Sequence, residues 1–154
     1  MIIKTFKGNI ANNGQDRIYL SGGEDDKGYR ISKFEALPSS GSTDIEGVLK
    51  IYVNEQLVIN PDINFNEDNL LATLILVQDD NHENTTPPSP IVFDREVVNQ
   101  DIYVTWACHD KSGNANYYIE LEEVTMPKGE QAVVNFKAAL LHGEWYKHLS
   151  FWVW

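Results

Sequence analysis

Three consecutive residues, Cys108, His109 and Asp110, contain the side chains that nucleophilic catalysis requires. A thiolate needs a base to take its proton, and the base needs a third group to orient it. These residues, however, begin or adjoin the turn-rich sequence HDKSGNAN. Because adjacent side chains in a turn point in different directions, we interpret them as turn residues and not as a catalytic group.

A pair of carboxylates, Asp44 and Glu46, lies in the sequence SGSTDIEG. Paired carboxylates serve as acid and base in catalysis or as calcium ligands. We interpret this pair as turn and cap residues that precede a strand. A second cluster of charged residues consists of Asp79, Asp80, His82 and Glu83. Their spacing matches no known metal site, and we interpret them as a solvated charged loop.

The two remaining histidines, His142 and His148, flank an aromatic C-terminal segment. We interpret them as surface residues, with a pH-sensitive docking element as the alternative. The sequence contains no HExxH, GxSxG, P-loop, dinucleotide fingerprint or CxxC pair. We therefore predict that the protein is not an enzyme and needs no cofactor or metal.

Composition limits the classes of partner. The chain has 154 residues, which suits one domain over residues 1–154, and a formal net charge of −11. Such a charge repels nucleic-acid backbones and anionic membranes. No apolar run approaches the roughly 20 residues of a membrane-spanning helix, and we expect no signal peptide at the N-terminus. The one cysteine allows no internal disulfide.

Alternating side chains over residues 101–125 predict two β-strands. Ile102, Val104 and Trp106 form one row of the first strand. Tyr117, Ile119 and Leu121 form one row of the second, alternating with Tyr118, Glu120 and Glu122. A period of two directs one row of each strand to a core and the other to solvent or a partner. With the turn between them, these strands predict a β-hairpin.

Other short strands are predicted along the chain, separated by Gly, Pro and Asn turns. Residues 70–78 are continuously apolar, which favours a strand covered on both sides, with a buried helix as the alternative. A break in alternation predicts a bulge near Ser32 and Lys33. The remaining strands are expected at residues 2–6, 17–20, 29–37, 48–53, 57–59 and 91–93. About eight strands predict an all-β, antiparallel β-sandwich, and this number is compatible with a jelly roll.

The C-terminal part differs from the rest. Residues 131–141 fit either a strand or, by their spacing and composition, one short helix, which we favour. Residues 144–154 hold three of the four tryptophans, so we expect either a final strand or an arm that docks on another subunit. The candidate assembly contacts in this arm are Trp145, Tyr146, Phe151, Trp152 and Trp154.

Tyrosines are frequent on the predicted strands, and we expect one ring of each neighbourhood to pack inward while another faces outward. An outward row of tyrosines suits a protein or sugar contact. Ordinary cross-strand pairing is the equal alternative. The aromatic residues concerned are Tyr29, Tyr52, Tyr103, Trp106, Tyr117 and Tyr118.

Three segments, PSSGSTDIEGVLKIY, IVFDREVVNQDIYVT and NANYYIELE, resemble patterns that recur in small virion structural proteins of marine bacteriophages, including those that infect cyanobacteria. The resemblance covers roughly residues 31–125 and includes no active site. It implies a sheet domain located in the virion, a minor capsid, decoration, vertex or tail-associated subunit that contacts copies of itself and other virion proteins. The alternative function is a carbohydrate-binding or lectin-like β-sandwich, with or without calcium.

Deletion of residues 144–154 tests the expected docking arm. We predict that the truncated chain stays folded but no longer assembles, because the arm contacts a neighbour and not its own core. Circular dichroism and light scattering measure the two properties. An unfolded truncated chain would show instead that these residues belong to the core.

Overall fold

The computed structural model describes residues 1–20, 26–41, 44–79, 89–93 and 96–125, and all regular structure in these ranges is β-strand. This confirms the predicted all-β class. The strands are β1 (Ile3–Ile10), β2 (Gly14–Ile18), β3 (Lys27–Pro38), β4 (Ile45–Tyr52), β5 (Leu70–Gln78), β6 (Ile91–Val92), β7 (Ile102–Cys108) and β8 (Ala115–Thr125).

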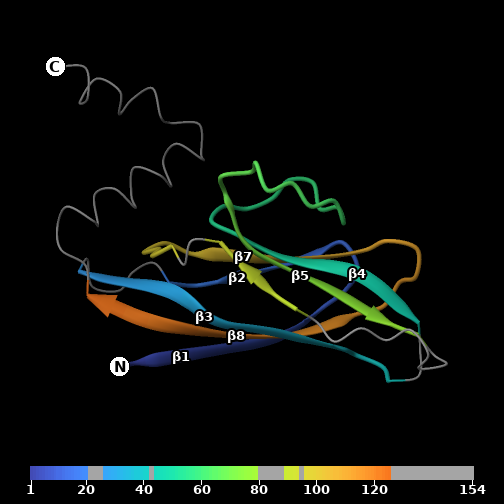
Figure 1. Ribbon diagram of the computed structural model, residues 1–154, viewed down its shortest axis with the longest axis horizontal. Coiled ribbons are helices and arrows are strands. Elements are labelled where there is room, and N and C mark those ends of the chain that lie inside the picture. The colour runs from blue at the N-terminus through green and yellow to red at the C-terminus, as the bar shows by residue number, and fades with distance from the viewer. Residues whose placement is uncertain (21–25, 42–43, 80–88, 94–95, 126–154) are drawn as a thin grey trace, which may run out of the picture.

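The strands form two antiparallel sheets that face each other, as Figure 1 shows with the sandwich seen along its edges. The three-stranded sheet has the order β1-β8-β3, and the five-stranded sheet has the order β2-β7-β4-β5-β6. The β-sandwich predicted from the sequence is therefore confirmed.

Part of the pairing order matches that of a jelly roll, in which one long antiparallel hairpin wraps around itself. The outermost pairs of such a hairpin are β1 with β8 and β2 with β7, and its innermost pair is β4 with β5. The order departs from a jelly roll at β6, which pairs with β5, so that β3 has only an isolated bridge from Tyr29 to Val98 on its side away from β8.

The predicted hairpin over residues 101–125 is wrong. Strand β7 pairs with β2 and β4, whereas β8 pairs with β1 and β3 in the opposite sheet. The connection over residues 109–114 therefore crosses from one sheet to the other. The alternation of side chains was correct, because the inner rows of β7 and β8 do face a core, but they meet across it and are not side by side in one sheet.

The core lies between the sheets and contains the inward rows of all the long strands. Every residue of the inner rows predicted for β7 and β8 is buried. Burial of large apolar side chains at about 25 cal/mol per Å² supplies most of the stability of such a domain. The largest fully buried side chains are Trp106, Phe34, Ile45, Leu49, Ile51, Leu74, Ile102, Ile119 and Leu121.

Residues 54–69 form an irregular segment that covers part of the outer face of the five-stranded sheet. Lys50 points outward from β4, yet it is only 3% exposed because this segment covers it. Its Nζ donates to the carbonyl oxygen of Asp62 in the segment at 2.7 Å. Gln15 and Gln56 exchange two further hydrogen bonds between β2 and this segment. The strand predicted at residues 57–59 is wrong, since the segment has no strand pairing and the Leu57 side chain is 97% exposed.

Other local predictions can be compared with the strands directly. The apolar run at residues 70–78 is a strand, as favoured, and the β3 register shifts between Ile31 and Lys33, which confirms the bulge. The first strand is longer than predicted and continues to Ile10. The helix predicted at residues 131–141 and the arm at residues 144–154 lie outside the described residues.

The described ranges contain no helix that is long and apolar enough to cross a membrane.

Gly47 provides a sharp test of the packing. A Cβ at this position would lie 2.5 Å from Cη2 of Trp106 and 2.6 Å from the Ala107 carbonyl oxygen. We predict that Gly47→Ala lowers the free energy of unfolding by about 1–3 kcal/mol, because the indole cannot move without disturbing the core. The matched control is Gly41→Ala, since a Cβ there meets no atom within 4 Å. Urea unfolding measures both, and equal stabilities would contradict the packing described.

Candidate functional site

The structure gives Cys108 a different partner from that of His109 and Asp110, which lie next to each other. The Cys108 thiol packs against the core and donates to the Gly113 carbonyl oxygen at 3.4 Å, and burial raises its pKa. His109 is exposed, with its Nδ1 3.0 Å from a carboxylate oxygen of Asp110. The thiol and the imidazole have different partners, since Cys108 ends β7 whereas His109 and Asp110 begin the connection to β8. The absence of a catalytic role stays a prediction.

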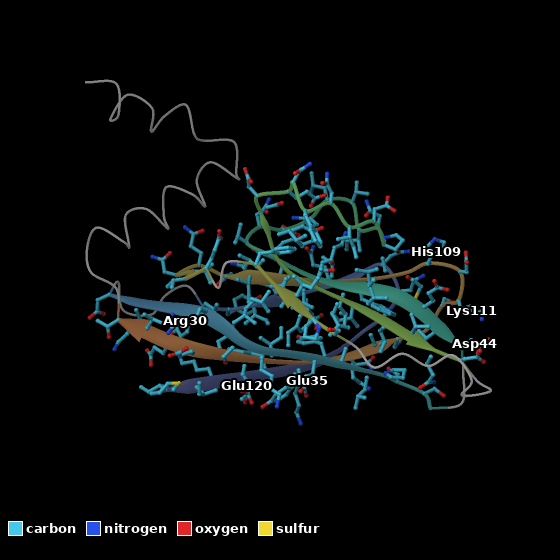
Figure 2. All side chains as sticks on the ribbon, in the orientation of Figure 1. Arg30, Glu35, Asp44, His109, Lys111 and Glu120 are labelled. Atoms are coloured by element: carbon cyan, nitrogen blue, oxygen red, sulfur yellow. The ribbon has the colours of Figure 1, made fainter. Side chains whose placement is uncertain are left out.

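The first carboxylate pair also has local roles. Asp44 lies 3.1 Å from the Nζ of Lys111, and Figure 2 shows both at the end of the sandwich that carries His109. The backbone of Glu46 accepts a hydrogen bond from the His109 amide. These contacts connect the start of β4 to the β7–β8 connection. Within the described residues, no three His, Cys, Asp or Glu side chains gather as a metal site would require.

The other sequence-predicted candidates lie largely outside the described residues. Asp80, His82 and Glu83 fall in one undescribed range, and His142 and His148 fall in another. The candidate assembly residues are also outside the description, and their role stays a prediction: Trp145, Tyr146, Phe151, Trp152 and Trp154.

The tyrosines divide as expected at residues 117 and 118. Tyr117 points into the sandwich and is 6% exposed, with its ring over Gly8 and its hydroxyl donating to Asp16 at 3.0 Å. Tyr118 points outward from the middle strand of the three-stranded sheet. Tyr52, by contrast, faces outward from β4 but is buried, because residues 54–69 cover that part of the sheet.

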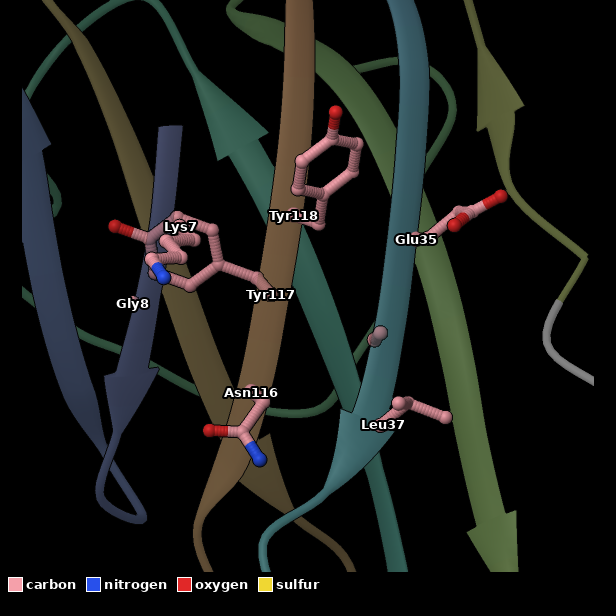
Figure 3. A pocket seen from close by; sticks show the side chains of 8 residues that line it. Lys7, Gly8, Glu35, Leu37, Asn116, Tyr117 and Tyr118 are labelled. Carbon is pink, nitrogen blue, oxygen red and sulfur yellow. The ribbon is translucent and has the colours of Figure 1, made fainter. Parts of the chain in front are cut away.

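A hollow of about 510 Å³ lies on the outer face of the three-stranded sheet, and we call it the outer hollow. Figure 3 shows that β1, β8 and β3 all contribute to it, with Tyr118 and Asn116 on β8 and Glu35 on β3. This volume is within the range of roughly 300–1,000 Å³ that is typical of ligand pockets. The lining residues are Lys7, Gly8, Glu35, Ala36, Leu37, Asn116, Tyr117 and Tyr118.

Amide groups form a hydrogen-bonded cluster at one end of the outer hollow. Asn9 donates to the Asn116 side-chain oxygen at 2.8 Å, and Asn114 donates to the Asn9 side-chain oxygen at 3.0 Å. Asn9 also donates to the hydroxyl of Ser39. The cluster engages the Asn116 side-chain oxygen and so constrains the orientation of its amide.

The opposite end of the hollow holds an aromatic ring and carboxylates. The Tyr118 hydroxyl donates to Glu120 at 2.7 Å, and this bond is the main cause that raises the tyrosine pKa. Glu35 is 3.5 Å from the Nζ of Lys33 and stays largely exposed. The Leu37 side chain, opposite Asn116 at the amide end, is 69% exposed and adds an apolar surface.

A second concave surface lies on the outer face of the five-stranded sheet, and we call it the apolar groove. Its volume is about 360 Å³. The exposed side chains of Phe65, Ile75 and Ile91 lie along it, and the Phe65 ring meets the Phe93 ring edge-on at 4.8 Å. Its full lining is Ile63, Phe65, Thr73, Leu74, Ile75, Val77, Ser89 and Ile91.

Sequence reasoning found Tyr118 but missed most of the residues around it. Asn9, Asn114 and Asn116 have the composition of turns, and only the register of β1 with β8 brings them together. The available signal was the outward row of β8, in which Asn116 precedes Tyr118 by one strand period.

Comparisons with known proteins give little. No protein-family model and no curated protein matches the chain. Among solved structures, a crystal structure of the Yersinia pseudotuberculosis-derived mitogen resembles it with a TM-score of 0.34 and 14% identity. That alignment covers 82% of this chain and 87% of the mitogen chain. We draw no functional argument from a likeness this weak.

Tyr117 provides a pH test of the region beneath the hollow. Burial, followed by the charge and hydrogen bond of Asp16, raises its pKa, so the fold favours the neutral phenol. This stabilisation is complete below the unfolded tyrosine pKa of about 10 and is lost as pH rises through the higher folded pKa. We predict that the free energy of unfolding falls above about pH 10 and that Tyr117→Phe makes this fall shallower.

Urea unfolding over an alkaline pH series measures the effect. Tyr52, whose pKa burial also raises, remains in the variant, so the fall is reduced and not abolished. Curves of equal slope for the variant and the wild-type protein would contradict this role of Tyr117.

Proposed function

We propose that the protein is a structural subunit of a bacteriophage virion that acts without catalysis, through contacts with neighbouring subunits. The observation that supports an assembly role best is the apolar groove. A contiguous apolar surface that is open to solvent marks a site of protein contact. The resemblance of residues 31–125 to virion structural proteins supports the location in a particle.

The groove has features of a protein-binding surface. Phe65 is 60% exposed, Ile75 is 52% exposed and Ile91 is 46% exposed, although all three are large apolar side chains. They belong to three separate parts of the chain, the covering segment, β5 and β6. The occupant that we propose is a second copy of this chain, since repeated self-contact is how one subunit builds a symmetric particle.

The charge of the chain supports a position on the outside of the particle. A net charge of −11 disfavours binding to packaged DNA, whose phosphates would repel it. Jelly rolls serve in viral capsids and also in lectins, so the fold alone does not choose between them. The groove favours assembly as the main role, and the carbohydrate-binding alternative is supported by the outer hollow.

Ile75→Asp tests the groove as an assembly surface. A charge at this position cannot be buried against an apolar neighbour without a large cost. We predict that self-association of the full chain weakens by at least about tenfold in the dissociation constant, which corresponds to roughly 1.4 kcal/mol. Light scattering over a concentration series measures it.

Leu57→Asp is the matched control, because it adds the same charge at a 97% exposed residue that does not line the groove. This variant should associate like the wild-type protein. A wild-type chain that stays monomeric throughout the series, or equal weakening by both substitutions, would contradict the proposed contact.

A further inference from the structure

We infer that the outer hollow is a binding site for a neutral oligosaccharide. This inference goes beyond the assembly role, because the hollow lies on the three-stranded sheet and the apolar groove lies on the outer face of the other sheet. The two surfaces share no lining residue. A ligand in the hollow therefore leaves the groove free for a neighbouring subunit.

The groups around the hollow match the chemistry of a sugar. A pyranose has hydroxyls that both donate and accept hydrogen bonds, and it also has faces of C–H groups. Tyr118 offers a ring beside which such a face can pack, and Leu37 adds further apolar surface. The Asn116 amide donates, and the Glu35 carboxylate accepts.

These groups are held in place before a ligand arrives. Asn116 is fixed through Asn9, and Asn9 in turn is fixed by Asn114. Tyr118 is held at its hydroxyl by Glu120. A preorganised site loses less side-chain entropy on binding, which favours affinity for a flexible ligand.

Charge selects a neutral ligand over an anionic one. Glu35 on the hollow is paired with Lys33 and Glu120 lies beside Tyr118, so with Lys7 the local charges balance, while the whole chain carries −11. Lys7 is the one cation of the lining. Sulfated or phosphorylated sugars would meet the net negative field of the whole chain, whereas a neutral oligosaccharide would not.

The test uses the full ¹⁵N-labelled chain and soluble hexasaccharides: cellohexaose, maltohexaose, N-acetylchitohexaose and a sulfated heparin hexasaccharide. We expect at least one neutral hexasaccharide to shift the amide resonances of residues 35–37 and 116–118. Tyr118→Ala should weaken that binding by at least about tenfold, which is the usual cost of losing an aromatic contact residue. Tyr118→Phe, which keeps the ring, should bind within about threefold of the wild-type chain.

One control variant and one substitute variant complete the test. Tyr19→Ala removes a 72% exposed tyrosine that does not line the hollow and should leave binding unchanged. Asn116→Ala removes an exposed amide and replaces Tyr118→Ala as the test if that variant does not fold. The inference is overturned if no neutral hexasaccharide binds, if the shifts lie elsewhere, or if the heparin hexasaccharide binds more tightly than the neutral sugars.

Discussion

Burial of the Trp106 indole between the two sheets is the interaction on which the architecture depends. The residue is fully buried on β7, and its Nε1 donates to the Gly113 carbonyl oxygen at 2.8 Å. Gly113 lies in the connection that leads to β8 in the opposite sheet, so the same indole fills the core and anchors the crossover. Gly47 on β4 leaves the space for the ring, because any side chain there would collide with it. One buried side chain thus contacts β4 in its own sheet and the connection that leads to the opposite sheet.

Because the inner rows of side chains form this core, only the outer faces of the two sheets can bind a partner or ligand. The two faces differ in the side chains that they expose. The three-stranded sheet presents amides, carboxylates and Tyr118 around a hollow, whereas the five-stranded sheet is partly covered by residues 54–69 and presents an apolar groove beside them. Lys50 shows why the covering segment stays in place, since its ammonium group is buried only because Asp62 and Asn60 accept its hydrogen bonds. Burial accordingly lowers the pKa of Lys50.

The sequence was a good guide to local structure and a poor one to partners. A period of two predicted which side chains of β7 and β8 enter the core, and an apolar run predicted β5. The hairpin was wrong because alternation defines two faces of a strand but not the strand beside it, and β7 and β8 pair with distant segments. For the same reason the amide cluster of the hollow was missed. Asn9 and Asn116 are 107 residues apart, and only the β1–β8 register brings them into contact.

The measurement that tests the proposed function most directly is the abundance of the chain in purified phage particles, where the proposed function would place it. Quantitative mass spectrometry against a major capsid protein gives the number of copies per particle. We predict a fixed number of copies that is retained through repeated purification in high salt. A chain that is present in infected-cell lysate but absent from purified particles would contradict a structural role in the virion.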